Sequence, residues 1–389
     1  MTPTPAQKLR DLRQDLTSSF RERQQVIDGC LAAVLAGEHV LLLGPPGTAK
    51  SALARSVAQA FSGRYFEWLL TKFSTPDELF GPVSLKSLEA DRFERITAGK
   101  LPEAEVGFID EVFRANSAIL NSLLTLMNER VYHNGGAPLC SPLVTLFGAS
   151  NDLPEGRELE AVFDRFLLRF DVPYLVQLAS LRDVLLAADP VSTVRLSMEE
   201  LRAAQAAAAQ VLVTPETIDG LLAIRDACQA DGIVASDRRW KKGLKLVRAS
   251  AWMMGEDRTS PEDLAVLVDS LWREPKERSK VARIVGQQAD PIGAQAQEVL
   301  EAARETMASV VQLKAGERSD YIGGAVKAMD TFIAQKNKLT ELRAAAGKRG
   351  KIVIADALAE VQGMHAEVKR VASESLGIVD RVLASVRGA

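Results

Sequence analysis

The feature that most limits the possible folds of this chain is the run Gly44–Ser51, written GPPGTAKS, directly after the apolar segment His39–Leu43. It departs at one position from the phosphate-binding pattern G-x-x-x-x-G-K-[ST], because Ala49 stands where that pattern has glycine. In such loops backbone N–H groups wrap the phosphates, the lysine neutralises β and γ oxygens, and the following hydroxyl holds Mg²⁺. Lys50 and Ser51 supply the last two groups.

The alanine is compatible with phosphate binding if its backbone has a negative φ, because a methyl group is then tolerated and helix propensity improves. We expect that conformation at Ala49, where the next helix begins. ATP with Mg²⁺ is the ligand that a strand, a glycine-rich turn and a helix favour in this order. The predicted cradle consists of Gly44, Pro45, Pro46, Gly47, Thr48, Ala49, Lys50, Ser51 and Ala52.

Strand and helix patterns alternate around this loop. Short apolar runs at 106–109 and 143–147 predict two more buried strands, and Ser51–Phe61 and Ser117–Glu129 have helical periodicity. This alternation predicts an α/β fold with a parallel sheet over residues 1–173, a P-loop core whose ligand binds beyond the carboxyl ends of the strands.

Polar side chains follow the predicted strands at that edge. Asp110 and Glu111 end the second strand, where Asp110 can position Mg²⁺, together with Ser51, and Glu111 can polarise an attacking water. Asn151 follows the third strand and can hold the γ-phosphate or the water. Taken singly, such an Asp-Glu pair is equally a surface loop, and such an Asn equally a turn residue. Together with the upstream loop they predict a hydrolytic site.

Helix signals replace strand signals after residue 173. Capping residues at Ser197, Thr214, Ser236 and Ser260 predict four helix starts, and these indicate an all-helical lid domain over residues 174–274. We expect helices to outnumber strands in the whole chain, because aromatic residues make up only 5% of it and alanine is abundant.

Residues 275–389 carry apolar or small side chains at alternating steps of three and four, which predicts long helices packed side by side. An ordinary bundle and a coiled coil fit this spacing equally. Turns are expected near Gly316 and at Gly347–Gly350, and His365 is expected to be packed rather than to bind metal. The expected seams are Ile292, Ala296, Val299 and Ala303; Ile322, Val326, Met329 and Ile333; and Ile354, Leu358, Val361, His365, Val368, Ala372, Ser375, Val379, Val382 and Val386.

Composition excludes several classes of function. Lys and Arg number 48 against 51 Asp and Glu, so the net charge of -3 offers no general field for nucleic acid. Three separated cysteines give neither a disulfide framework nor a Cys-x-x-Cys metal site, and we expect buried thiols. No apolar run reaches the length of a signal peptide core or a spanning helix, so the expectation is a soluble, cytoplasmic protein without membrane insertion.

The order of these motifs resembles that of AAA+ ATPases, and more narrowly that of the MoxR group and its RavA-type regulatory ATPases. The resemblance covers roughly residues 9 to 272. It is carried by GPPGTAKS, Leu101–Glu105, Phe108–Asn116, Ile119–Leu124, Asn128–Arg130, Asn151–Glu155, Phe163–Phe166 and Ser236–Trp240.

The resemblance implies a homo-oligomeric ring, usually of six subunits, with each ATP between neighbours. The arginine that acts in trans maps to Arg165, with Arg169 as the alternative, and the second-sensor arginine maps to Arg238, with Arg239 as the alternative. The capped helix start and the guanidinium of Arg238 are both expected to face phosphate. Without the resemblance, Arg165 or Arg169 would be interpreted as part of a surface salt bridge, and Arg238 as a solvated residue in the first turn of a helix.

The resemblance also implies a biological role, the remodelling or maturation of protein complexes with a partner that contains a von Willebrand factor A (VWA) domain. The segment 81–99 corresponds to an insert, and 132–136 to a hairpin turn, both near the pore of the ring. RavA-type proteins insert a compact β-rich module after the lid, whereas the tail here reads as helices alone. Two other hypotheses are a nucleotide-gated scaffold with slow hydrolysis and a DNA-acting motor, which the balanced charge disfavours.

Overall fold

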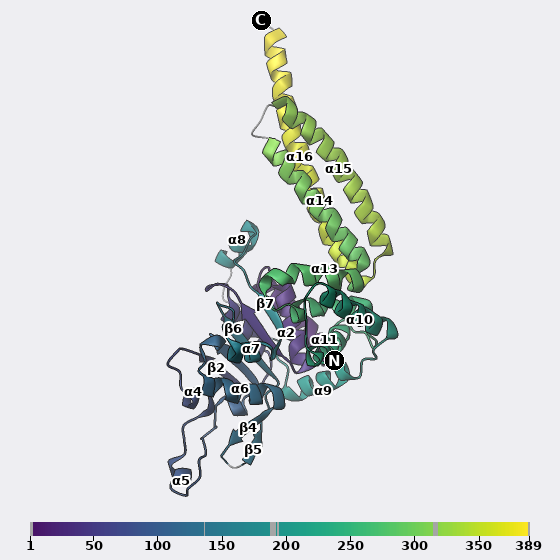
Figure 1. The fold of residues 1–389 in the computed structure, drawn as a ribbon. Coiled ribbons are helices and arrows are strands. Elements are labelled where there is room, and N and C mark those ends of the chain that lie inside the picture. Colours follow the sequence, from purple (N-terminus) through teal and green to yellow (C-terminus); the bar gives the residue numbers. More distant parts are fainter. Residues whose placement is uncertain (1–2, 136, 187–191, 193, 314–317, 388–389) are drawn as a thin grey trace. The chain divides into compact units, whose positions relative to one another are not determined.

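The computed structural model describes residues 3–135, 137–186, 192, 194–313 and 318–387 (Figure 1). Within those ranges the side chains are described except at 137, 157, 312–313, 318–322, 348–349, 352 and 371–387. The chain divides into two compact units, Met1–Val281 and Ala282–Ala389, and each has its own apolar core.

The first unit is built on a five-stranded parallel sheet with the strand order β2-β3-β6-β1-β7. This confirms the predicted α/β class with a parallel sheet. The central strands read as apolar runs because helices cover both faces, and every residue of β1 is buried. The strands are β1 (His39–Leu43), β2 (Tyr65–Leu69), β3 (Val106–Asp110), β6 (Thr145–Ser150) and β7 (Phe166–Asp171).

The sequence analysis misses two of these strands and misplaces a third. β2 lies at the edge of the sheet and is only partly buried, so its polar and aromatic residues give no continuous apolar run. β7 contains Arg169, a charged residue that hides the strand pattern. β6 begins at Thr145 rather than at 143 and continues to Ser150, which brings Asn151 directly to the carboxyl end of the sheet.

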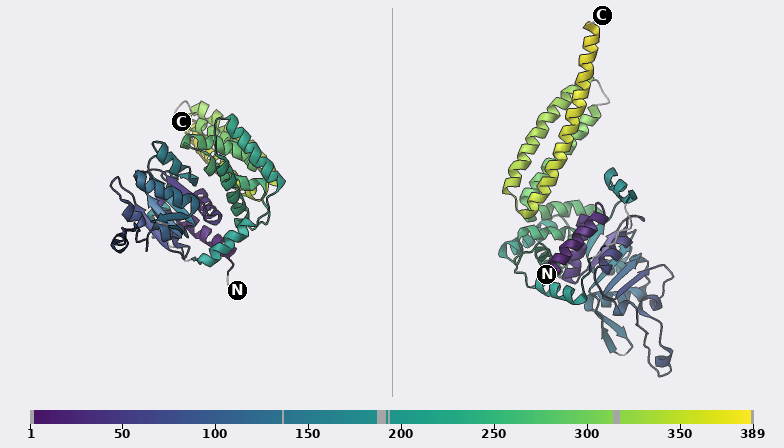
Figure 2. Two further views of the ribbon diagram at one scale, coloured as in Figure 1. Left: turned by 60° about the horizontal axis from the view of Figure 1, so that its bottom comes forward. Right: turned by 180° about the vertical axis from the view of Figure 1, so that it is seen from behind.

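Helices cover the two faces of the sheet (Figures 1 and 2). α1, α2 and α3 share a buried cluster with Val40, Phe108 and Phe147, and α9 and α11 add to that cluster. α6 and α7 pack against each other on the opposite face. The helices of this unit are α1 (Pro5–Ser19), α2 (Gln24–Ala36), α3 (Lys50–Gln59), α4 (Pro76–Phe80), α5 (Leu85–Leu88), α6 (Ser117–Glu129), α7 (Arg157–Phe163), α8 (Leu178–Leu186), α9 (Met198–Ala209), α10 (Pro215–Ala230), α11 (Asp237–Met253) and α12 (Val268–Leu271), with 3₁₀ turns at Leu101–Glu103, Val112–Arg114, Pro261–Leu267 and Pro275–Glu277.

The predicted helix starts after residue 173 are present with one difference. Ser197, Thr214 and Ser236 each accept a backbone N–H as N-caps of α9, α10 and α11, and Ser197 forms the expected capping box with Glu200. Ser260 also forms a capping box, but the segment that follows is a 3₁₀ helix before α12 begins. The division of the chain at residues 173 and 274 stays a prediction.

A buried histidine fixes the amino ends of the central strands. The Nδ1 atom of His39 accepts the backbone N–H of Leu146 at 2.9 Å, and Nε2 lies 2.9 Å from the carbonyl oxygen of Met127 and 2.6 Å from Nη1 of Arg130. Burial, followed by the charge of Arg130, lowers the pKa of His39 well below its ordinary value. The imidazole therefore remains neutral at neutral pH.

The predicted insert and hairpin lie beside each other (Figure 1). β4 (Val131–Asn134) and β5 (Ala137–Cys140) pair antiparallel, with Gly135 in the turn and residue 136 outside the described residues. The amide side chain of Asn134 donates to the carbonyl of Arg95 and accepts the N–H of Arg95, so it joins the hairpin to the segment 81–99.

The second unit is a bundle of long helices, α14 (Pro291–Leu313), α15 (Arg318–Ala345) and α16 (Lys348–Arg387). α13 (Arg278–Ala289) spans the boundary between the units. All elements in the described part of this unit are helices. The predicted seams of α14 and α16 are buried or partly buried at every described position, and the ring of His365 contacts that of Phe332.

The predicted seam of α15 is right at Met329, which packs against the core, and shifted by one residue at Val326 and Ile333. Ala325, Ala328 and Phe332 face the core, whereas Val326 and Ile333 are each 46% exposed, because the smaller and aromatic side chains allow the closer packing. Ile322, Lys348, Arg349 and the predicted seam beyond Val368, together with Gly316, lie outside the described residues or side chains. The predicted turn at Gly347–Gly350 is also too long, since α16 already begins at Lys348.

Three further observations bear on the composition argument. Cys30 and Cys228 are buried as expected, whereas Cys140 is exposed on the hairpin. Among the described residues no helix combines the length and apolar character needed to cross a membrane. The same residues contain no group of three His, Cys, Asp or Glu side chains arranged to hold a metal ion.

Candidate functional site

The loop after β1 is shaped by two glycines. Gly44 has φ +144°, and a Cβ there would lie only 2.4 Å from the carbonyl oxygen of Val172, so no larger residue fits without a shift. Gly47 has φ +81°, with open space around it. The Thr48 hydroxyl donates to the carbonyl of Pro45 at 3.0 Å and closes the turn, and Ala52 lies in the first turn of α3.

Ala49 has φ 65° and ψ 22°, the left-handed conformation that favours glycine. The expectation of a negative φ is therefore wrong. The loop still needs the backbone turn that glycine provides in the common pattern, and the alanine adopts it at a cost of about 1 kcal/mol. The position thus has a glycine conformation with an alanine side chain.

The amine of Lys50 lies inside the loop. It donates to the carbonyls of Gly44 and Pro45 at 2.6 and 2.8 Å and to Oδ1 of Asn151 at 3.1 Å. Burial lowers the pKa of Lys50, and the charges of Asp110 and Glu111 oppose that effect. The amine is thus held where β and γ phosphate oxygens would replace its carbonyl partners.

Ser51 and Asp110 form the expected pair of oxygen ligands. The Ser51 hydroxyl donates to Oδ2 of Asp110 at 2.8 Å, across the space between α3 and β3. A hydroxyl beside a carboxylate is a set of hard oxygen donors that suits Mg²⁺, which keeps several waters and few protein ligands in phosphate sites. The donor set fits the ion that the loop implies.

Glu111 and Asn151 are also brought together. The Asn151 amide donates through Nδ2 to Oε1 of Glu111 at 2.6 Å, while its Oδ1 accepts from Lys50. Glu111 has φ 52°, again left-handed, at the turn after β3. A bridge from Lys50 through Asn151 to Glu111 therefore spans the carboxyl ends of β1, β6 and β3, and we call these residues with Ser51 and Asp110 the nucleotide edge.

Comparison with known proteins agrees with this geometry. A family model described as "MoxR domain in the MoxR-vWA-beta-propeller ternary systems" matches residues 7–212, and a model described as "AAA lid domain" matches residues 216–285. The chain belongs to the MoxR family of AAA+ ATPases. Membership of this family implies nucleotide binding, and the residues that bind the nucleotide stay a prediction.

Several relatives resemble this MoxR protein over most or part of its length. "Uncharacterized protein MJ0812" of Methanocaldococcus jannaschii is 44% identical over 276 residues, which cover 70% of this chain and 74% of the relative. "Chaperone MoxR1" of Mycobacterium tuberculosis is 28% identical over 156 residues, 39% of this chain and 41% of the relative. A crystal structure from Cytophaga hutchinsonii superimposes with a TM-score of 0.60 at 17% identity, over 73% of this chain and 94% of the other, and supports the fold.

Arg165 and Arg238 do not lie at the nucleotide edge. Phe166 pairs with His39 and Asp171 pairs with Leu43, so Arg165 lies at the amino end of β1, while the loop follows its carboxyl end. The five residues of β1 span about 13 Å at about 3.3 Å per residue. The guanidinium of Arg238 lies near Arg165, and neither side chain has contact with the chain's own loop in the described structure.

One carboxylate, that of Asp164, contacts both of these arginines and their two alternatives. Asp164 accepts hydrogen bonds from Arg238 and Arg239, and lies 3.7 Å from Arg165 and 3.7 Å from Arg169. We call Asp164 and its four arginines the arginine cluster. Asp164 has no predicted role within the motif Phe163–Phe166, although the arginines close to positions 165 and 238 in the sequence indicate that a carboxylate partner is needed.

The two alternative arginines, Arg169 and Arg239, are buried. Arg169 is 2% exposed and donates to the carbonyls of Trp272 and Phe163, with its guanidinium 3.9 Å from the Phe163 ring. Arg239 is 4% exposed and donates to the carbonyls of Leu167 and Ser270. Neither reaches out of the molecule, whereas the side chains of Arg165 and Arg238 are 22% and 35% exposed.

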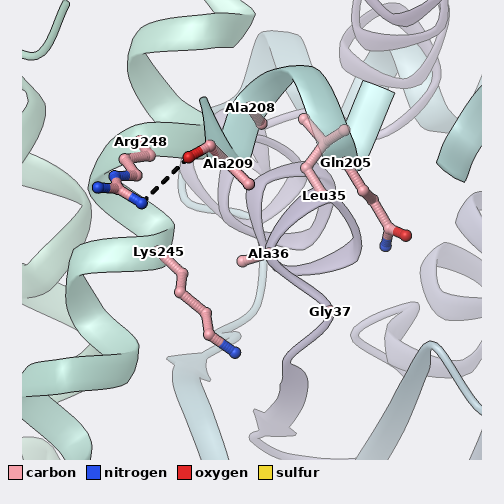
Figure 3. A pocket seen from close by; sticks show the side chains of 8 residues that line it. All are labelled: Leu35, Ala36, Gly37, Gln205, Ala208, Ala209, Lys245 and Arg248. Carbon is pink, nitrogen blue, oxygen red and sulfur yellow. Dashed lines mark hydrogen bonds between the residues drawn. The ribbon is translucent and has the colours of Figure 1, made fainter. Parts of the chain in front are cut away.

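Two hollows lie away from the nucleotide edge. One of about 200 Å³ adjoins the arginine cluster and is lined by Asp164, Arg169, Val234, Ala235, Ser236, Arg239, Leu271 and Arg273. The other, of about 340 Å³, lies between α2, α9 and α11 (Figure 3). Its cations are already paired, since Lys245 contacts Glu38 at 3.0 Å and Arg248 donates to the carbonyl of Ala209 at 3.1 Å.

Proposed function

We propose that this protein is a Mg²⁺-dependent ATPase, in which water attacks the γ-phosphate in line. In this proposal the loop N–H groups and Lys50 bind the phosphates, and Ser51 and Asp110 hold Mg²⁺, which neutralises phosphate charge when bound. Glu111 polarises the water, and Asn151 positions it relative to Glu111. The bridge from Lys50 through Asn151 to Glu111 is the observation that carries the proposal.

The substitution Glu111→Gln tests this assignment. We expect the variant to bind ATP as the parent does and to hydrolyse it at least about 10²-fold more slowly, because a water-activating group is lost while the shape remains. Glu216→Gln is the control, since that exposed carboxylate lies in the first turn of α10, outside the nucleotide edge and the arginine cluster. Turnover by Glu111→Gln equal to that of the parent would rule the assignment out.

We further propose that Arg165 and Arg238 both act on the nucleotide of a neighbouring copy. They lie at the opposite end of β1 from the chain's own loop, so a second copy must bring its nucleotide edge to them. The charges suit this arrangement, because four arginines surround one carboxylate at the arginine cluster, while Asp110, Glu111 and a triphosphate are negative. An interface between two different surfaces of one chain is head to tail and closes into a ring when the rotation permits. The expected ring is a hexamer.

Mixed rings test this shared site. Arg165→Ala retains its own Glu111, and Glu111→Gln retains its own Arg165, so each variant alone should lack complete sites. In a mixture, an Arg165→Ala subunit can receive the arginine of a Glu111→Gln neighbour, and we expect several-fold more ATPase activity than the sum of the two variants. Additive activity would show that the arginine acts within its own chain or not at all.

The biological role that we propose is the remodelling or maturation of protein complexes with a VWA-domain partner. The description of the matching family model, which names VWA and β-propeller proteins, supports this partner class. The client would contact the segment 81–99, where Leu85, Leu88, Phe93 and Ile96 are 51 to 77% exposed. Capture by Glu111→Gln with ATP, compared with the same variant carrying Leu85→Ser and Phe93→Ser, would test this contact. The RavA-type affiliation and the cytoplasmic location stay predictions.

A slow, switch-like variant of this function has one observation in its favour. The polar groups of the site bond to one another, since Lys50 donates to the loop carbonyls and Glu111 accepts from Asn151, so ATP binding would have to exchange these contacts. If ATP binding alone recruits partners, Lys50→Ala should abolish partner binding while Glu111→Gln preserves it. If hydrolysis is needed, both variants should fail in client remodelling.

A further inference from the structure

α8 has its polar side toward its own chain and its apolar side toward solvent. A helix turns by about 100° per residue, so Leu178, Leu181 and Leu185 form one stripe, while Ser180 and Asp183 lie on the opposite side. Ser180 is 8% exposed and Asp183 contacts Arg21 at 3.2 Å. This arrangement is the inverse of a normal surface helix.

The apolar side of α8 is large for its length. Leu178, Leu181 and Leu185 form its centre and are 84, 44 and 76% exposed. Val184 and Leu186 flank them at 46 and 75%, and the exposed Arg182 lies between Leu178 and Leu186. Contiguous exposed apolar side chains of this kind mark an interaction surface. We call Leu178, Leu181, Val184, Leu185 and Leu186 the α8 stripe.

The chain holds α8 firmly at its start. The carboxylate of Glu22, whose backbone φ is 57°, accepts the N–H groups of Val176 and Gln177 at 2.9 and 3.0 Å. These backbone hydrogen bonds lower the pKa of Glu22 and place a negative charge at the start of α8, where the helix dipole favours it. The stripe is thus presented from a fixed position.

That position adjoins the nucleotide edge. The segment that leads to α8 leaves β7 at Asp171, which pairs with Leu43 just before the loop, and the Tyr174 hydroxyl donates to the carbonyl of Pro46 at 3.2 Å. Leu178 is four residues further, so its Cα lies within about 14 Å of the Cα of Tyr174. A copy whose Arg165 and Arg238 reach a phosphate in this loop must therefore bring its surface close to the α8 stripe.

The arginine cluster offers an apolar counterpart. Val234 is 59% exposed, lines the 200 Å³ hollow beside Asp164, and lies two residues before the cap of α11, the helix that carries Arg238. The surface that would bring the functional arginines to a neighbour thus also brings an exposed aliphatic side chain. One orientation of two copies therefore brings the arginine cluster to the neighbour's nucleotide edge and Val234 to the neighbour's α8 stripe.

We propose that the α8 stripe is a contact between copies of this chain, docking on the next subunit beside its arginine cluster. The inference rests on the proposed ring and adds an apolar anchor to it. The anchor would couple assembly to the nucleotide site, because the segment between β7 and α8 touches the loop at Pro46. Its occupant is a second copy, not a membrane or the client.

The test measures assembly of the full chain with ATP bound, in the Glu111→Gln background, by sedimentation velocity over a range of concentrations. Leu178→Ser with Leu185→Ser should raise the concentration for half-assembly at least about tenfold, since a buried leucine contributes that much to association. Both side chains are exposed, so the fold should persist, and the affinity of the unassembled chain for ATP should be unchanged. Val326→Ser with Ile333→Ser is the control, because those side chains are exposed on α15.

The outcomes separate the inference from the proposed ring. Assembly of the parent with an unchanged midpoint for Leu178→Ser with Leu185→Ser overturns the inference alone. The same holds if that double variant assembles normally but loses binding to phospholipid vesicles. If Glu111→Gln with ATP stays monomeric at every concentration, the ring and the inference fall together, whereas its loss of hydrolysis would still support the catalytic site.

Discussion

Replacing Asp164 by Asn removes the only carboxylate in contact with the four arginines of the arginine cluster among the described residues. The side chain keeps its shape, so the change is mainly one of charge. Arg239 and Arg169 are 4% and 2% exposed and cannot turn to water when the carboxylate is lost. We therefore expect the first unit to lose stability.

The expected loss is about 2 kcal/mol in the free energy of unfolding. Leaving a buried charge without its partner typically costs about 3 to 5 kcal/mol. Two features reduce that value here. The Asp164 side chain is 36% exposed, so solvent screens its charges, and Arg239 keeps the carbonyls of Leu167, Phe166 and Ser270 as acceptors.

The loss should also depend on pH. Burial alone raises the pKa of Asp164, but the charge of Arg239 and the hydrogen bonds from Arg238 and Arg239 outweigh it and hold the pKa below its ordinary value. A carboxyl with a lowered pKa stabilises the fold above its unfolded pKa of about 3.9, and this contribution is lost as pH falls through the folded value. The parent and Asp164→Asn should therefore become equally stable in acid, once the pH lies below the folded pKa of Asp164.

Urea unfolding followed by tryptophan fluorescence measures this effect. The four tryptophans, Trp68, Trp240, Trp252 and Trp272, all lie in the first unit, so the second unit does not contribute to the signal. Asp28→Asn is the matched control, because Asp28 is 34% exposed and contacts one guanidinium, that of Arg13, and it should cost at most about 1 kcal/mol. Equal effects of the two substitutions at neutral pH would refute the reasoning.

The remaining predictions concern both units. Ala49→Gly should stabilise the first unit by about 0.5 to 1 kcal/mol, because glycine adopts φ 65° without strain. The control Ala203→Gly, on the exposed side of α9, should destabilise the unit by about 1 kcal/mol. If both substitutions lower the urea midpoint, the left-handed conformation of Ala49 is wrong. Because the imidazole of His39 stays neutral in the fold, the free energy of unfolding should fall by up to about 1.4 kcal/mol per pH unit as pH drops below about 6.5. His39→Gln should lower that slope. An unchanged slope, measured by urea unfolding at several acidic pH values, would contradict this role of His39. Phe332→Ala should destabilise the bundle by about 3 to 5 kcal/mol and Ile333→Ala by less than about 1 kcal/mol, because of these two side chains only that of Phe332 is fully buried. Unfolding followed by circular dichroism measures both values. Similar losses would favour the seam first expected for α15.

Much of the nucleotide edge was predictable because its residues follow apolar strands. A parallel sheet brings the carboxyl ends of its strands together, so the loop, Asp110, Glu111 and Asn151 had to meet once the fold class was known. Glycines and caps are equally local signals, and Ser197 and Ser236 begin helices where the sequence analysis expects them. The conformation of Ala49 was not predictable, since alanine has no local reason to adopt a positive φ.

The sequence by itself determined the fold class, the family and the residues of the nucleotide edge, because periodicity and short-range spacing encode them. Only the tertiary structure decided which arginines are available. Arg165 and Arg169 are four residues apart, but Arg165 is partly exposed, whereas Arg169 lies in β7, is buried and donates to the carbonyl of Trp272. It also decided that Arg238 lies across the sheet from the chain's own loop, and that α8 turns its leucines outward. Burial and strand register depend on contacts between segments far apart in the sequence, so no local stretch of sequence specifies them.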